Sequence, residues 1–167
     1  GARAMGMGHA FTGMANDAST IYWNPAGLMN VQRKEFTSMY TNLFYDTRYT
    51  YMAAALPRTW LGPHNAIGVG WVHLNMGNFD GRDIDNNPMG FFSVNEQALY
   101  ISFAHEIVGS WGILNLGASA KWIDMGFGSN ARGDVGSAGT LDFGATFRPM
   151  NAPLLKIISL RYLMPLQ

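Results

Sequence analysis

The chain has 167 residues, of which only 13% are charged, and its 11 basic and 11 acidic side chains leave no net charge at neutral pH. Soluble domains carry about 25% charged residues, so this composition favours a lipid or fibrous environment over water. A chain without net positive charge has no electrostatic basis for binding nucleic acid, and a chain without cysteine has no disulfide, thiolate metal site or thiol nucleophile. No apolar run reaches the roughly 18 residues that a membrane-spanning helix needs.

Residues 1–33 show no strand alternation and contain the turn signal Asn24-Pro25-Ala26-Gly27. Pro25 fixes its own φ and biases Asn24 toward an extended conformation. The Asn24 side chain can accept hydrogen bonds from nearby backbone amides, and Gly27 can end the turn. The sequence therefore predicts a tight bend within a non-strand segment.

From about Glu35 onward, apolar and polar residues alternate with a period of two, which predicts strands with two different faces. The clearest example is Thr140–Arg148, where Leu141, Phe143 and Phe147 share one face. About seven strands are predicted, over Phe36–Phe44, Arg48–Leu56, Ala66–Asn75, Leu99–Ala104, Leu114–Trp122, Thr140–Arg148 and Leu155–Leu163.

The predicted connections differ in length. Those around Met76–Asn95 and Met125–Ser137 are expected to be long loops, whereas Ile107–Ser110 and Pro149–Pro153 are short. Long loops at one end and short turns at the other are typical of outer-membrane barrels. Aromatic residues near the strand ends are expected to form the interfacial girdles, namely Tyr49, Trp71, Trp111, Trp122 and Tyr162.

Charged residues inside the strands predict which face is polar, because Arg or Lys facing lipid at mid-depth costs about 2–4 kcal/mol. Lys121, Asp142 and Arg148 are therefore expected to face the lumen, together with Tyr100. A register with Trp122 opposite Leu141 places Lys121 opposite Asp142. These two residues then form either an ion pair or two separately solvated charges.

The predicted fold is an all-β, transmembrane, antiparallel up-and-down β-barrel. An odd set of about seven strands does not close such a barrel, so residues 34–167 are expected to supply an incomplete barrel. Either further strands follow Gln167 or protomers combine to close the sheet, and missing sequence is the favoured explanation. A lipocalin-like soluble barrel, with its apolar face turned inward, is the alternative; the low charge content counts against it.

The N-terminus resembles a known family. Gly1-Ala2-Arg3-Ala4-Met5-Gly6-Met7-Gly8 and the later run Asn16-Asp17-Ala18-Ser19-Thr20-Ile21-Tyr22-Trp23-Asn24-Pro25-Ala26-Gly27-Leu28 are similar to the mature N-terminus of PorV/PorQ-like proteins in the FadL-like outer-membrane superfamily. The resemblance implies a bacterial outer-membrane barrel of about fourteen strands. It also implies that residues 1–33 form a hatch inside the barrel, with Asn24, Pro25, Ala26 and Gly27 as its motif. The later residues do not match the ligand-pocket residues of the fatty-acid transporters.

Three functions follow from this interpretation. The first is passive passage of hydrophobic small molecules or lipids, with Tyr100, Ala104, Gly117 and Gly144 lining the lumen and the hatch controlling access. The second is a PorV-like component of type IX secretion that docks exported proteins through its external loops. The third is a purely structural outer-membrane protein. The expected partners are membrane lipid and either a hydrophobic ligand or a secretion-system protein.

No motif predicts an enzyme, a cofactor or a metal site. The four histidines have no metal-ligand spacing. The run Asp83-Ile84-Asp85-Asn86-Asn87 imitates a calcium loop, but Pro88 occupies the glycine position and Val94 the position of the bidentate Glu. A solvated external loop is the favoured interpretation, with weak calcium binding as the alternative.

Overall fold

The computed structural model describes residues 2–8, 10–44, 46–58, 61–128 and 134–150. Its N-terminal part contains two short α-helices and one 3₁₀ helix, and six strands follow. The elements are α1 Ala2–Gly6, α2 Thr20–Trp23, η1 Pro25–Asn30, β1 Glu35–Asn42, β2 Arg48–Pro57, β3 Asn65–Arg82, β4 Pro88–Gly109, β5 Gly112–Gly128 and β6 Asp134–Pro149.

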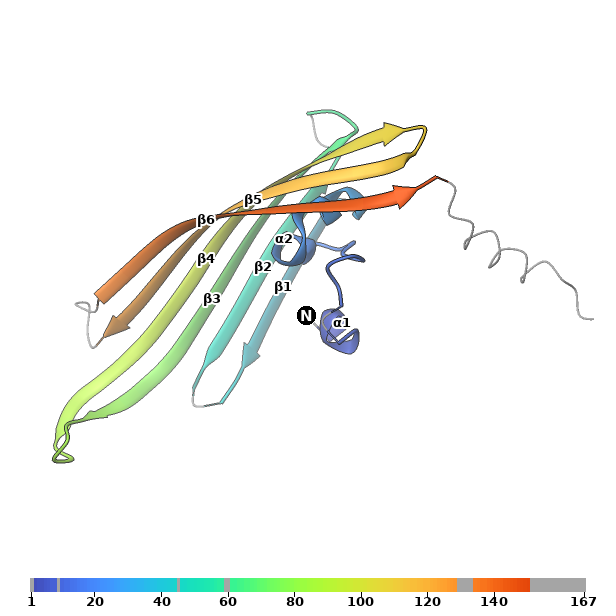
Figure 1. The fold of residues 1–167 in the computed structure, drawn as a ribbon. Coiled ribbons are helices and arrows are strands. Elements are labelled where there is room, and N and C mark those ends of the chain that lie inside the picture. The colour runs from blue at the N-terminus through green and yellow to red at the C-terminus, as the bar shows by residue number, and fades with distance from the viewer. Residues whose placement is uncertain (1, 9, 45, 59–60, 129–133, 151–167) are drawn as a thin grey trace, which may run out of the picture.

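The described strands form one antiparallel sheet in the sequential order β1 to β6. Each strand pairs with the next along the chain, and β1 and β6 are the edges of this open, curved sheet (Figure 1). The prediction of an all-β fold with antiparallel up-and-down strands is thus confirmed for this part of the chain. The predicted strand Leu155–Leu163 lies outside the described residues.

The sheet has two different faces, as the alternation in β4 shows. The exposed fractions of Leu99, Ile101 and Phe103 are 44%, 57% and 43%. Those of the intervening Tyr100, Ser102 and Ala104 are 6%, 1% and 0%. We call the face with Tyr100, Ser102 and Ala104 the inner face and the opposite one the outer face.

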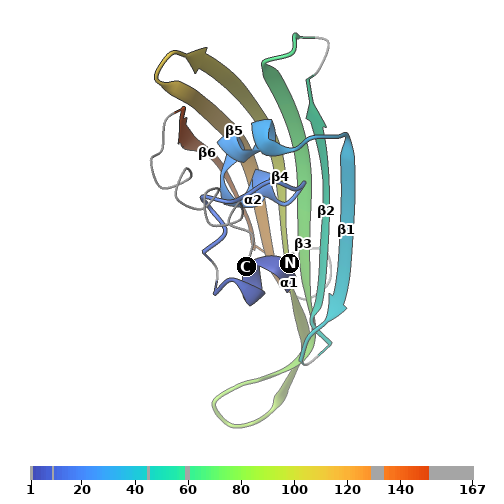
Figure 2. The ribbon, with the colours of Figure 1, turned by 90° about the vertical axis from the view of Figure 1, so that its right-hand side faces the viewer.

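The N-terminal segment, residues 2–33, packs against the inner face (Figures 1 and 2). Ile21 of α2 and Leu28 of η1 are fully buried there against small side chains of the sheet, among them Ala55 and Ala104. A second apolar cluster holds the beginning of the segment together, with Phe11 buried beside Ala15 and Trp23. The core of the molecule therefore lies between the segment and the sheet.

The two predicted long loops are wrong. β3 continues to Arg82 and β4 begins at Pro88, so most of Met76–Asn95 is a two-stranded ribbon whose tip is Asp83–Asn87. Met125–Ser137 likewise belongs largely to β5 and β6. Glycine, Asp and Asn lower the strand propensity of both regions, but antiparallel pairing outweighs propensity: β3 pairs with β4 along the ribbon, and the end of β5 pairs with both β4 and β6.

The predicted register of β5 and β6 is also wrong, by two residues. Trp122 pairs with Gly139 rather than Leu141, and Ser119 rather than Lys121 lies opposite Asp142. Because the side-chain period of a strand is two, this error leaves every residue on its predicted face.

Candidate functional site

The Asn24–Gly27 bend is held by the Asn24 side chain. Its Oδ1 accepts a hydrogen bond from the backbone N–H of Ala26 at 3.1 Å, and its Nδ2 donates to the carbonyl of Thr12 at 3.1 Å. Asn24 is extended, with φ −162°, as expected for a residue before proline. Asn24 thus caps η1 and ties it to the preceding part of the segment.

Gly27 does not end the turn, contrary to the prediction, since η1 continues to Asn30. Its role is steric. A Cβ at Gly27 would overlap the Thr20 hydroxyl and lie 2.6 Å from the carbonyl oxygen of Ala15. The absence of a side chain therefore allows α2, η1 and the Ala15 main chain to pack together, and it frees the Thr20 hydroxyl to donate to the carbonyl of Asn24 at 2.7 Å.

The bend sits on a row of small residues that crosses the inner face. Paired in order across β3 to β6, this small-residue row is Ala66, Ala104, Gly117 and Gly144. A Cβ at Gly117 would lie 2.5 Å from the carbonyl carbon of Pro25, and one at Gly144 would overlap the Asn24 side-chain oxygen. Glycine within a strand often marks such a close approach of another backbone.

Ala104, Gly117 and Gly144, which are expected to line the lumen, lie on the inner face of the sheet, and the N-terminal segment packs over them there. Larger side chains at these positions would keep the N-terminal segment away from the sheet. The sequence signal for this seat is one glycine on the polar face of each of two alternating strands; that the two glycines face each other is known only from the register.

A polar cluster anchors the end of η1 to the sheet. The Asn30 side-chain oxygen accepts hydrogen bonds from Arg148 Nη2 at 3.1 Å and from Asn115 Nδ2 at 3.4 Å. Asn115 also donates to the Thr146 hydroxyl at 3.1 Å. Arg148 thus lies on the inner face and binds the segment directly. Sequence reasoning missed Asn30 and Asn115, since isolated asparagines carry no distinctive pattern.

Lys121 and Asp142 form an ion pair on the inner face, as one of the two sequence alternatives predicts. Lys121 pairs in register with Thr140, so its ammonium reaches Asp142 diagonally along β6. It also lies over the ring of Tyr100, 5.3 Å from the centroid, and Tyr100 contacts Tyr22 of the segment at 6.3 Å between centroids. The ion pair is thereby linked to the N-terminal segment.

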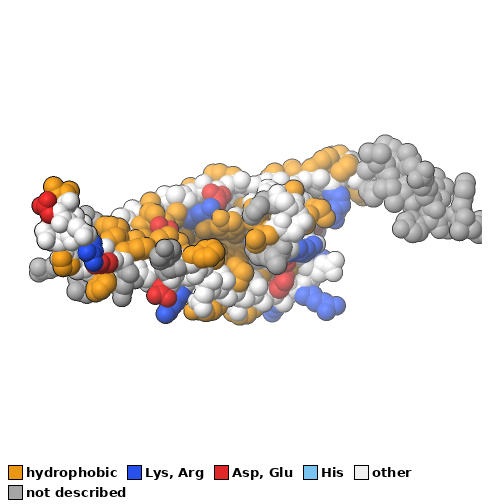
Figure 3. All heavy atoms as spheres, turned by 90° about the horizontal axis from the view of Figure 1, so that it is seen from below, with side chains coloured by type: hydrophobic (Ala, Val, Ile, Leu, Met, Phe, Trp, Pro, Cys, Tyr) orange, Lys and Arg blue, Asp and Glu red, His pale blue; other side chains and the backbone are white. Residues whose placement is uncertain are grey.

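Beyond the segment, the inner face becomes apolar toward the β3–β4 ribbon. We call this surface the inner apolar wall; its residues are Leu74, Met76, Phe79, Phe92, Val94, Met125 and Phe127. The rings of Phe79 and Phe92, and those of Phe92 and Phe127, have centroids 5.2 Å apart. Glu96 is the polar exception in this wall. A space-filling view shows apolar side chains gathered in the hollowed middle of the molecule (Figure 3).

The outer face carries a broad apolar surface that no other described segment covers. We call it the outer apolar band; its members are Leu56, Ile67, Val69, Trp71, Leu99, Ile101, Phe103, Ile107, Leu114, Leu116, Trp122, Leu141, Phe143 and Phe147. The polar residues Asn65 and His105 interrupt it, and they hydrogen-bond to each other at 2.8 Å.

The outer apolar band ends abruptly. The next outer row along the strands is polar, with His73, Gln97, Asp124 and Ser137, and Trp71 and Trp122 stand at the boundary. On β5 the band runs from Leu114 to Trp122, roughly 26 Å along the strand, or about 20 Å along the normal at a tilt near 40°. Tyr49, predicted for an aromatic girdle, instead lies on the inner face beside Tyr51.

The fold and these surfaces define an all-β protein, in which an antiparallel sheet carries a helical segment on one face and an apolar band on the other. No protein-family model, curated protein or solved structure matches the chain. The resemblance to PorV/PorQ-like proteins stays a prediction.

Among the described residues, no helix combines the length and the apolar character needed to cross a membrane. The same part of the chain contains no group of three or more His, Cys, Asp or Glu side chains that could hold a metal ion.

Proposed function

We propose that the sheet is part of the wall of a bacterial outer-membrane β-barrel and that the N-terminal segment lies in its lumen. The outer apolar band supports this proposal most strongly. Outer-membrane barrels have an apolar band about 25 Å tall with aromatic residues at its margins, and the band here has a comparable height and a sharp polar boundary marked by Trp71 and Trp122.

The finer features of this proposal come from the resemblance. By that resemblance the barrel has about fourteen strands in all. Further strands are needed to close the described sheet, because an open edge in lipid would leave backbone groups without partners. The segment acts as a FadL-like hatch, with Asn24, Pro25, Ala26 and Gly27 forming the bend that seats it on Gly117 and Gly144.

Within this barrel, we propose passive passage of hydrophobic small molecules or lipids. The inner apolar wall supports this role, because aromatic side chains that face a lumen offer an apolar compound a surface that water does not favour. The wall leads to the N-terminal segment. Passage beyond that point requires the segment to shift, since its bend fills the space over the small-residue row.

Neighbouring residues of β4 provide the test. Phe92 lies on the inner wall and the adjacent Phe91 faces outward. The full-length protein is purified in mild detergent, and the apolar compounds that accompany it are extracted and quantified. We expect Phe92→Gln to lower the bound amount several-fold and Phe91→Gln to leave it unchanged. Equal amounts in both variants and the unchanged protein would contradict the role in passage.

A second candidate is docking of an exported protein. The β3–β4 ribbon favours it, because β4 is 22 residues long and continues well past the outer apolar band, with Ile84 and Met89 exposed near its tip. A stoichiometric protein that accompanies the barrel, and that is lost in Ile84→Asp and Met89→Asp but kept in Phe92→Gln, would support docking. A purified barrel that carries neither an apolar compound nor a partner protein would favour the purely structural role.

A further inference from the structure

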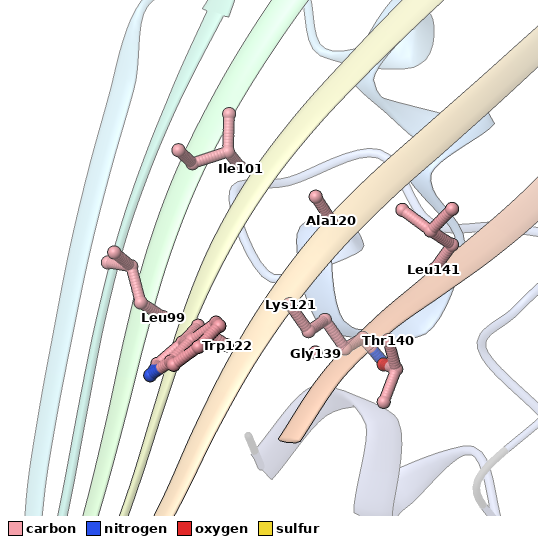
Figure 4. Close-up of a pocket in the computed structure, with 8 residues that line it drawn as sticks. All are labelled: Leu99, Ile101, Ala120, Lys121, Trp122, Gly139, Thr140 and Leu141. Atoms are coloured by element: carbon pink, nitrogen blue, oxygen red, sulfur yellow. The ribbon is translucent and has the colours of Figure 1, made fainter. Parts of the chain in front are cut away.

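A groove of about 550 Å³ lies in the outer apolar band, across β4, β5 and β6 (Figure 4). Its walls are Leu99 and Ile101 of β4, Trp122 of β5 and Leu141 of β6, and its floor is Ala120 and Gly139. This volume falls within the ~300–1,000 Å³ range of small-molecule sites.

The groove exists because two small residues occupy neighbouring outer positions. Ala120 lies between Ile101 and Leu141 in one cross-strand row, and Gly139 ends the next row beside Trp122. The outer side chains beside them in these two rows, Leu99, Ile101, Trp122 and Leu141, are long or aromatic. The groove therefore results from the small side chains at Ala120 and Gly139 and from the register that brings them side by side.

Its largest wall is held in place. The Trp122 indole N–H donates to Asp124 Oδ1 at 3.0 Å, and Gln97 Nε2 contacts the other oxygen of that carboxylate at 3.5 Å. The indole lies beside Leu99, its partner in the register (Figure 4). A side chain fixed at its polar end keeps the groove open, whereas a free indole could rotate over it.

The lining chemistry favours an apolar occupant. Lys121 and Thr140 also border the groove, but the Lys121 ammonium lies on the inner face with Asp142. Ordered water needs two to four polar partners, and the outer-face side chains here offer none except the Trp122 N–H, which Asp124 already engages.

The position of the groove identifies the kind of occupant. It lies at the margin of the outer apolar band, directly below the polar row of Gln97, Asp124 and Ser137. A bilayer lipid has the same polarity profile, with an apolar chain in the hydrocarbon and polar groups at the boundary. We propose that this groove binds one acyl chain of a membrane lipid, an inference that rests on the proposed membrane location.

Photo-crosslinking tests this site. The full-length protein is reconstituted into phosphatidylcholine vesicles that contain phosphatidylcholine with a diazirine in one acyl chain, and the labelled peptides are mapped by mass spectrometry. We expect adducts concentrated on Ala120–Trp122 and Gly139–Leu141. Ala120→Leu should lower this labelling several-fold, and Ala118→Leu, on the same strand and face but outside the groove, should leave it unchanged. Gly139→Leu gives an independent check from β6.

The possible outcomes separate the two proposals. Adducts spread evenly over the outer apolar band would overturn the groove while supporting the membrane location. Absence of adducts from the whole outer face would overturn both. Labelling by a diazirine fatty acid but not by the phospholipid would assign the groove to a free acid and would also overturn the inference. Variants that do not insert into vesicles are replaced by Ala120→Val and Ala118→Val.

Discussion

Single residues decide how closely the N-terminal segment approaches the sheet. Gly117 and Gly144 lie opposite each other on β5 and β6. The Pro25–Ala26 main chain occupies the space that a Cβ at Gly117 would fill, and the Asn24 side chain and the Pro25 ring occupy that of Gly144. The interaction is steric, so it depends on the absence of atoms rather than on a specific bond. Tight interiors tolerate added methyl groups poorly for the same reason.

Gly144→Ala should therefore destabilise the protein. The added Cβ overlaps the Asn24 side-chain oxygen, and we expect the free energy of unfolding to fall by about 1–3 kcal/mol, the usual cost of overpacking. Tryptic cleavage after Arg33 and Lys34 should become faster, because the segment is held less tightly. Gly136→Ala is the matched control on the same strand, since its Cβ meets no atom within 4 Å. Equal stability and equal cleavage in the two variants would refute the steric role.

At the scale of elements, the alternation of residues predicts the faces of the strands but not their lengths. The outer positions Leu99, Ile101 and Phe103 and the inner positions Tyr100, Ser102 and Ala104 follow from the sequence alone. The extension of β3 and β4 through Phe79 and Phe92 does not, because Gly77, Gly81 and Gly90 resemble loop residues until pairing across the ribbon is known. For that reason the sequence alone does not predict that the residues of the inner apolar wall share one face of a sheet.

The tip of the β3–β4 ribbon is closed by one carboxylate. Asp83 accepts hydrogen bonds from the Asn87 side chain at 3.0 Å and from the backbone N–H groups of Asn87 and Asp85 at 2.8 and 2.9 Å. Asn86 adopts a positive φ of 67° in this turn. The pKa of the Asp83 carboxyl lies below its ordinary value, mainly because the Asn87 side chain donates to the charged form.

The direction of this pKa shift predicts how the tip responds to acid. A carboxyl whose pKa is lower in the folded state stabilises the turn at pH values above the ordinary pKa of aspartate. This contribution is lost as the pH falls through the folded-state pKa. The NMR signal of the Asn87 amide should therefore shift with a midpoint below that of an ordinary aspartate, and Asp83→Asn should abolish the transition. A midpoint at or above the ordinary value would contradict this account of the turn.

The whole molecule is organised by its two faces, one covered by the N-terminal segment and one bare and apolar. A water-soluble barrel would place the apolar side chains in its interior, whereas here the inner face carries glycine, alanine, serine and the Lys121–Asp142 ion pair beneath the segment. The composition predicts this arrangement, because a chain with 13% charged residues has too few of them to cover a large surface.

A charge on the outer face tests the membrane location. Phe103→Arg places a guanidinium in the middle row of the outer apolar band on β4 and should cost about 2–4 kcal/mol of stability in phosphatidylcholine vesicles. Gln97→Arg lies on the same strand and face but in the polar row, and we expect a change below about 1 kcal/mol. Urea unfolding from vesicles measures both. Equal costs at the two positions would argue against a hydrocarbon boundary between them.

The seat of the N-terminal segment also selects how β5 and β6 pair. A shift of two residues keeps every side chain on its face, so alternation alone cannot distinguish the observed pairing from the one with Trp122 opposite Leu141. That alternative would place Thr146 beside Gly117 and Ser119 beside Gly144, dividing the space that the bend requires. The segment, which ends at residue 33, thus sets the alignment of two strands of which the first begins only at Gly112, and a chain lacking it would be free to pair them in either arrangement.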